Sequence, residues 1–121
     1  MRESELERKF CRLVGQSGGK AYKFTSPGNS GVPDRLVVLP EGRIGFVELK
    51  QGGGKQPGRL QQFQMAELER LGCYTAVVDS MESGATVIDE MLRQKPTASD
   101  QDKLFLEMVN RTPVWKKGGV Q

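Results

Sequence analysis

Residues 31–50 constrain the fold more than any other part of the chain, because two apolar runs there flank a short turn. The runs cover residues 36–39 and 44–49, and the turn between them contains a proline and a glycine. This pattern predicts a β-hairpin. Asp34 lies at the start of the first strand, and Glu48 and Lys50 lie at the end of the second. Because Glu48 and Lys50 are two residues apart, their side chains point to the same face of the sheet.

The hairpin brings acidic residues together. In an antiparallel pair, the start of one strand adjoins the end of the other, so we expect Asp34 to face Glu48 and Lys50 across one step of the ladder. Two carboxylates at that separation can share a divalent cation.

Helical and strand patterns alternate along the rest of the chain. Apolar residues recur at helical spacing in segments that predict helices: residues 3–14, 60–71, a segment that Ser80 or Ser83 caps and Pro96 ends, and one from about Ser99. Further strands are expected at residues 20–25 and, as a buried strand, at 73–78. The order helix, three strands, helix, strand and two helices predicts a small α/β sheet flanked by helices.

Composition limits the reaction classes. The 121 residues fit one domain. The chain has no histidine, which excludes Ser-His-Asp and Cys-His catalysis and nucleases with a histidine base. Cys11 and Cys73 form no Cys-x-x-Cys pair, so neither a zinc cluster nor a disulfide framework is expected. Any catalysis must use carboxylates, lysine and a metal.

Charge and hydropathy point to a location and a partner. The 18 basic and 15 acidic residues give a net charge of +3, which suits a polyanionic partner. No apolar run approaches the roughly 20 residues of a membrane span, and the charged N-terminal segment has no apolar signal core. We therefore expect a soluble cytoplasmic protein.

Several motifs together resemble the VRR-NUC family of the PD-(D/E)xK nuclease superfamily, in its stand-alone phage and bacterial form. They are GGKAYKFTSPG at residues 18–28, GVPDR at 31–35, GRIGFVELK at 42–50, and Leu60-Gln61 ahead of Gly72. With the first helix and the last strand, the resemblance spans residues 3–80. It implies a restriction-endonuclease-like α/β core, with a mixed sheet of about four strands in the order αβββαβ.

The resemblance also implies an activity and a domain organisation. Residues 1–95 would form the nuclease core, and residues 96–121 a C-terminal helix and basic tail of the same domain. The implied activity is cleavage of DNA phosphodiester bonds with Mg²⁺ or Mn²⁺, in branched DNA such as Holliday junctions or flaps, by a homodimer. No family motif is recognised beyond Ser80.

Matched by position, the resemblance assigns metal ligation to Asp34, Glu48 and the backbone carbonyl of Leu49. Lys50 becomes the catalytic lysine. These roles fit the chemistry, because hard oxygen ligands favour Mg²⁺ or Mn²⁺, and the bound ion neutralises phosphate charge and acidifies water. A charged lysine beside two carboxylates can hold the phosphate or the nucleophile.

Two further roles come from the helices. In the family, a carboxylate from the first helix completes the metal site; Glu7 is favoured here because its surroundings are similar to a Glu-Arg-x-apolar pattern, and Glu3 is the alternative. Gln61 matches the glutamine that follows the third core strand, which positions a ligand or the attacking water.

The predicted DNA contacts are basic. Arg35, Lys55 and Arg59 are candidate phosphate contacts, together with the lysines of the C-terminal tail. In that tail Trp115 is expected to be buried against another subunit, and stacking on a base is the alternative. The apolar stripe of the last helix is either part of the core or, as a hypothesis, packs across a twofold axis; it comprises Leu104, Phe105, Met108 and Val109.

Each assignment has a structural alternative. Asp34 can be a turn aspartate after Pro33, and Glu48 and Lys50 an exposed charge pair. The glutamates of the first helix can be ordinary surface acids, and Gln61 an ordinary first-turn residue. The rival functions are a catalytically silent DNA-binding module with a nuclease-like fold, and an interaction protein whose acids bind no metal.

Overall fold

The computed structural model describes residues 1–52, 57–95, 107 and 109–110. Lys55 and most of the C-terminal segment, including Trp115 and the lysine-rich tail, lie outside the described residues. The predicted last helix and its apolar stripe also lie outside them, apart from three positions that include Val109.

The elements of residues 1–95 follow the predicted order. They are α1 (Glu3–Gln16), β1 (Lys20–Lys23), β2 (Arg35–Leu39), a 3₁₀ turn (Pro40–Gly42), β3 (Arg43–Leu49), α2 (Arg59–Arg70), β4 (Tyr74–Val78) and α3 (Met81–Leu92). The sheet has the order β1-β2-β3-β4, with β3 and β4 parallel and the other pairs antiparallel. The predicted mixed four-stranded α/β fold is therefore confirmed.

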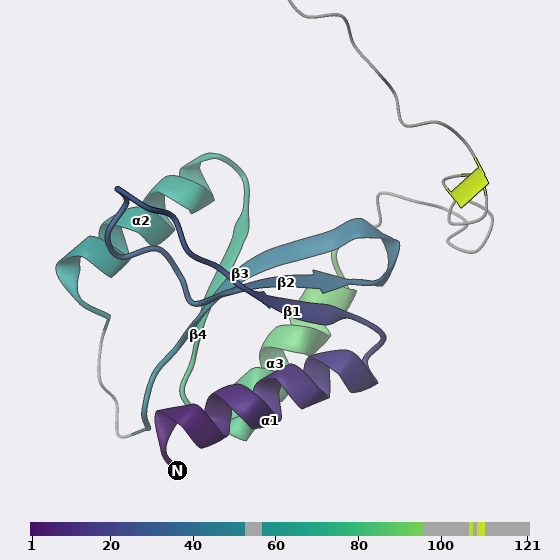
Figure 1. Cartoon of the computed structure of the whole chain (residues 1–121), viewed down its shortest axis with the longest axis horizontal. Helices are drawn as coiled ribbons and strands as arrows, with labels where there is room; N and C mark the ends of the chain where they lie inside the picture. Colours follow the sequence, from purple (N-terminus) through teal and green to yellow (C-terminus); the bar gives the residue numbers. More distant parts are fainter. Residues whose placement is uncertain (53–56, 96–106, 108, 111–121) are drawn as a thin grey trace, which may run out of the picture.

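The helices lie on both faces of the sheet (Figure 1). α1 and α3 cover one face, where Val37 and Leu39 of β2 and Val47 and Leu49 of β3 are at most 2% exposed. Period-two alternation places these four side chains on the same side of the sheet. They form one apolar core with residues of the two helices, namely Leu6, Phe10, Val14, Val87, Ile88 and Met91.

Local signals explain where the helices begin and end. α1 continues past Gly15 to Gln16, and the chain turns at Gly18, whose φ is +85°, while the amide of Gly19 donates to the carbonyl of Val14. This is the left-handed turn that glycine favours after a helix. α3 begins with a reciprocal cap, because Ser80 Oγ accepts from the amide of Ser83 and Ser83 Oγ accepts from that of Ser80.

The opposite face of the sheet is only partly covered, and here one prediction was wrong. The fourth strand was expected to be buried, but only Val78 is; the other residues of β4 are half-buried. β4 is an edge strand, and α2, which lies against it, contributes no fully buried residue. Leu60 and Phe63 of α2, and Leu71 at its C-cap, are each more than 60% exposed. None of the helices in the described part of the chain is long and apolar enough to span a membrane.

Candidate active site

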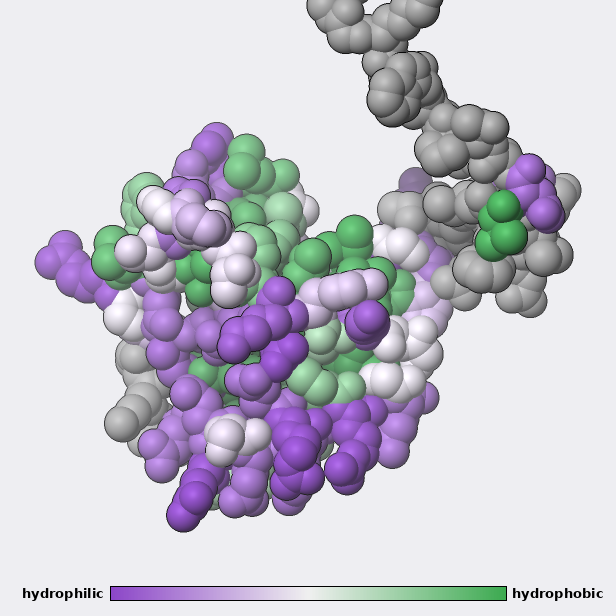
Figure 2. All heavy atoms as spheres, viewed as in Figure 1, coloured by the Kyte–Doolittle hydropathy of each residue, from purple (hydrophilic) through white to green (hydrophobic). Residues whose placement is uncertain are grey.

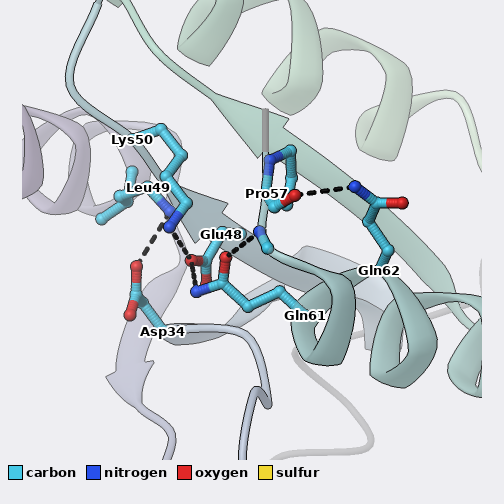
Figure 3. Close-up of polar contacts among 8 residues, drawn as sticks. Asp34, Glu48, Leu49, Lys50, Pro57, Gln61 and Gln62 are labelled. Atoms are coloured by element: carbon cyan, nitrogen blue, oxygen red, sulfur yellow. Dashed lines mark hydrogen bonds and ion pairs between the residues drawn. The ribbon is translucent and has the colours of Figure 1, made fainter. Parts of the chain in front are cut away.

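The hairpin places the predicted acids as its register requires. Arg35 pairs with Val47, so Asp34 and Glu48 are the next residues outward on the two strands. Asp34 Oδ2 accepts a hydrogen bond of 2.9 Å from the backbone N–H of Leu49. Figure 3 shows the side chains of Asp34, Glu48 and Lys50 converging at this end of the strands. The predicted meeting of these three residues is thus present in the structure.

Glu48 is the centre of this group. Its side chain is only 2% exposed, and its Oε2 lies 3.1 Å from the ammonium nitrogen of Lys50 and accepts a 2.5 Å hydrogen bond from Gln61 Nε2. Its other oxygen, Oε1, is buried and has no hydrogen-bond partner among the described residues. A buried carboxylate oxygen without a donor is unfavourable on its own. Glu48 therefore has one satisfied oxygen and one that has no donor among the described residues.

The electrostatic environment penalises the charge on Glu48. Burial raises the pKa of its carboxyl group, and the neighbouring negative charge of Asp34 raises it further, whereas the hydrogen bond and positive charge of Lys50 lower it; the pKa remains above its usual range. A bound cation would offset this penalty by adding positive charge beside the carboxylate. The folded chain therefore holds the charged form of Glu48 at an electrostatic cost.

Gln61 is held in one orientation. Its Oε1 accepts a 3.1 Å hydrogen bond from the backbone N–H of Gly58, which leaves Nε2 to donate to Glu48 (Figure 3). The role of Gly58 was missed by the sequence analysis, although glycine three positions before glutamine at a helix start is a variant of the capping-box signal. The first turn of α2 thus fixes which oxygen of Glu48 is occupied.

Glu7, the favoured third carboxylate, has a different partner in the structure. Its Oε1 accepts a hydrogen bond from Arg35 Nη2, while Arg35 Nη1 donates to the backbone oxygen of Ala21 at 3.3 Å. Within residues 1–52, 57–95, 107 and 109–110, no three acidic, cysteine or histidine side chains are grouped as a metal site. The assignment of Glu7, or of Glu3, as a metal ligand stays a prediction.

The predicted DNA contacts are not all equivalent. The side chain of Arg35 is 15% exposed and bound to Glu7, so it holds α1 against the sheet. Arg59 is exposed at the start of α2, two residues before Gln61. Phosphate contact by either residue stays a prediction, and Lys55 lies outside the described part of the chain.

Comparison with known proteins places the chain in a family. A scan against family models finds no match. The chain is 48% identical over 82 residues to "Putative nuclease p44" of Acyrthosiphon pisum secondary endosymbiont phage 1, covering 68% of this chain and 87% of that protein. A solved structure described as a VRR_NUC domain superposes with a TM-score of 0.69 at 30% identity, covering 72% of this chain and 94% of that one. The chain belongs to the VRR-NUC family.

This membership agrees with the position of the site. In this VRR-NUC chain, four of the residues that carry the resemblance meet where β2 begins, β3 ends and α2 begins: Asp34, Glu48, Lys50 and Gln61.

Proposed function

We propose that this VRR-NUC nuclease is a divalent-metal-dependent DNA endonuclease that uses Mg²⁺ or Mn²⁺ and acts on branched DNA such as Holliday junctions. The observation that carries the proposal is the buried Glu48 carboxylate, which leaves Oε1 without a partner among the described residues, beside Asp34. Hard carboxylate oxygens are the donors that Mg²⁺ and Mn²⁺ prefer. Asp34, Glu48 and the backbone carbonyl of Leu49 would hold the ion.

Each side chain then has a distinct task. When bound, the cation neutralises charge on the scissile phosphate and makes the attacking water more acidic. Asp34 keeps its orientation because the Leu49 amide fixes its Oδ2. Lys50, 21% exposed and anchored by Glu48, presents its ammonium group where it can hold a phosphate oxygen or orient water. Gln61 keeps Glu48 turned so that Oε1 stays available.

A cleavage assay tests this proposal. Labelled four-way junction and linear duplex of the same sequence are incubated with the protein, with Mg²⁺ or with a chelator. We expect Mg²⁺-dependent cleavage that is faster on the junction, and loss of cleavage with retained DNA binding in Asp34→Asn. Asp89→Asn, an exposed acid paired with Arg93 on α3, is the matched control and should cleave normally. Salt-dependent binding without cleavage of any DNA would instead support the silent binding module.

We also propose that the enzyme is a homodimer. We define the apolar face as Tyr22 and Ile44 on the sheet, Leu60 and Phe63 on α2, and Leu71 at the C-cap of α2. These residues are 47–65% exposed. Figure 2 shows apolar surface over α2 and over the sheet beside it. Large exposed apolar patches are uncommon on monomers, and a twofold dimer would carry paired sites suited to paired incisions.

Sedimentation at micromolar concentration tests the dimer. Ile44→Glu and Phe63→Glu should each shift the protein towards monomer, whereas Leu92→Glu, on α3 and 37% exposed, should not. A monomeric wild-type protein, or equal behaviour of all the variants, would contradict the proposed dimer.

A further inference from the structure

The loop between β1 and β2 lies directly against the start of α2. Within this loop Gly31 has a φ of +87°, and a Cβ atom added to it would lie 2.7 Å from the carbonyl carbon of Leu60, 2.8 Å from its oxygen and 2.9 Å from the amide nitrogen of Gln61. All three are backbone atoms of the first turn of α2, so a rotation of a side chain cannot relieve the clash. Figure 1 shows the loop passing beside this end of α2.

This contact occurs where the helix carries the residue that orients Glu48. Gln61 makes two hydrogen bonds, from the Gly58 amide and to Glu48 Oε2, and both depend on the position of the first turn. The same loop continues through the buried Pro33 into Asp34. The loop and the helix therefore share one contact that fixes the separation between Asp34 and Gln61.

We propose that Gly31 is a positioning residue, whose missing side chain lets the loop seat α2 so that Gln61 stays bonded to Glu48. Carbon atoms in contact are separated by about 3.5–4.0 Å. A Cβ at this position would thus force the loop and α2 apart by roughly 1 Å, since the shortest distance would otherwise be 2.7 Å. Displacements of this size are enough to disturb a catalytic group.

A second glycine of the same loop provides the control. Gly28 has a φ of +82°, close to that of Gly31, but a Cβ added there has nothing within 4 Å. Alanine therefore brings the same kind of backbone strain at both positions and a collision only at Gly31. The difference between the two variants isolates the contact with α2.

The inference rests on the function proposed above, so its test includes a measurement that does not depend on metal or DNA. In the wild type, an NOE is expected between the Gly31 Hα protons and the amide proton of Gln61. The side-chain amide signal of Gln61, assigned by its loss in Gln61→Ala, should shift towards that of a solvent-exposed amide in Gly31→Ala and stay unchanged in Gly28→Ala. A missing NOE, or an unmoved amide signal in folded Gly31→Ala, overturns the proposal.

Mn²⁺ affinity, measured by calorimetry on the full chain, gives the second test. Losing the partner that orients a metal ligand typically weakens affinity about 10–100-fold, so we expect a loss of at least about 10-fold for Gly31→Ala and less than about 2-fold for Gly28→Ala. In the Gln61→Ala background, Gly31→Ala should add almost nothing, because its effect passes through Gln61. Additive losses of Mn²⁺ affinity would overturn the proposal, because they would mean that Gly31→Ala acts by displacing Asp34 rather than Gln61.

Failure of the proposed function can be distinguished from failure of the proposal for Gly31. If the wild type binds no Mn²⁺ and cleaves no DNA, the proposed function fails, while the NOE and the Gln61 amide signal still decide the role of Gly31. If Gly31→Ala does not fold, Gly31→Asn replaces it, since asparagine adopts a positive φ at lower cost and carries the same Cβ. Its matched control is Gly28→Asn.

Discussion

Replacing Glu48 by glutamine tests whether the fold carries this charge at a cost to its own stability. Glu48 is 2% exposed, and its pKa is raised chiefly by burial. The folded chain therefore holds the Glu48 proton more tightly than the unfolded chain does. Stability from this group is complete well below pH 4.5, the ordinary pKa of the carboxyl, and is lost as the pH rises through the folded value. Glutamine does not titrate and avoids that loss.

The size of the effect follows from the contacts of Glu48. Burying a charge costs several kcal/mol even after relaxation, and hydrogen bonds to a charged group, here those of Lys50 and Gln61, return about 1.5–3 kcal/mol each. A neutral amide of the same shape avoids the cost of burying a charge and keeps hydrogen bonds worth about 0.5–1.5 kcal/mol each. The balance favours Glu48→Gln by on the order of 1 kcal/mol at pH 7, or about 4 °C in Tm for a domain of 121 residues.

Urea denaturation from pH 3 to pH 9, in the presence of a chelator, measures this difference. Glu48→Gln should be more stable than the wild type at pH 7, the gap should close in acid, and cleavage should be lost. Glu67→Gln is the matched control, in which the change in stability should have the opposite sign. Arg70 lowers the pKa of the exposed Glu67, so removing this charge should reduce stability slightly at neutral pH. A Glu48→Gln protein less stable than the wild type at pH 7, or a gap independent of pH, would refute the reasoning.

The other perturbations also have defined outcomes. Lys50→Met should lower kcat on the order of 10²–10³-fold with little change in KM, because the ammonium group acts in the transition state; single-turnover cleavage measures it, and an unchanged rate would remove the lysine from catalysis. Glu7→Gln should weaken Mn²⁺ binding in calorimetry and Glu3→Gln should not; equal behaviour would remove Glu7 from the metal site. Gly15→Ala has no atom within 4 Å of the new Cβ and should stabilise α1 by up to about 1 kcal/mol in urea denaturation. Gly19→Ala should destabilise, since its Cβ would lie 2.3 Å from a backbone oxygen of β2.

The hairpin was predictable because its information is local. A short turn between two apolar runs determines the register, and the two-residue period then determines which side chains share a face. Asp34, Glu48 and Lys50 were therefore placed together correctly from spacing alone. The hydrogen bond from Gln61 to Glu48 was harder to predict, because it depends on how α2 docks, and about nine residues separate α2 from β3.

Long-range packing explains what the sequence could not predict. Apolar periodicity identifies the apolar side of α2, but it does not show what covers that side, and Phe63 is 62% exposed. Similarly, Arg35 was assigned to DNA from its charge. Its partner Glu7 is 28 residues away on another element, and no short-range pattern indicates that ion pair.

The bond from Arg35 to Ala21 bears on how copies of the chain can associate. β1 is an edge strand, and alternate carbonyl groups of such a strand point outward, where a strand of another molecule could add to the sheet. Arg35 reaches across β1 and occupies the carbonyl of Ala21, and the exposed Lys20 and Lys23 add charge at the two ends of the strand. Strand addition at the β1 border of the sheet is therefore discouraged.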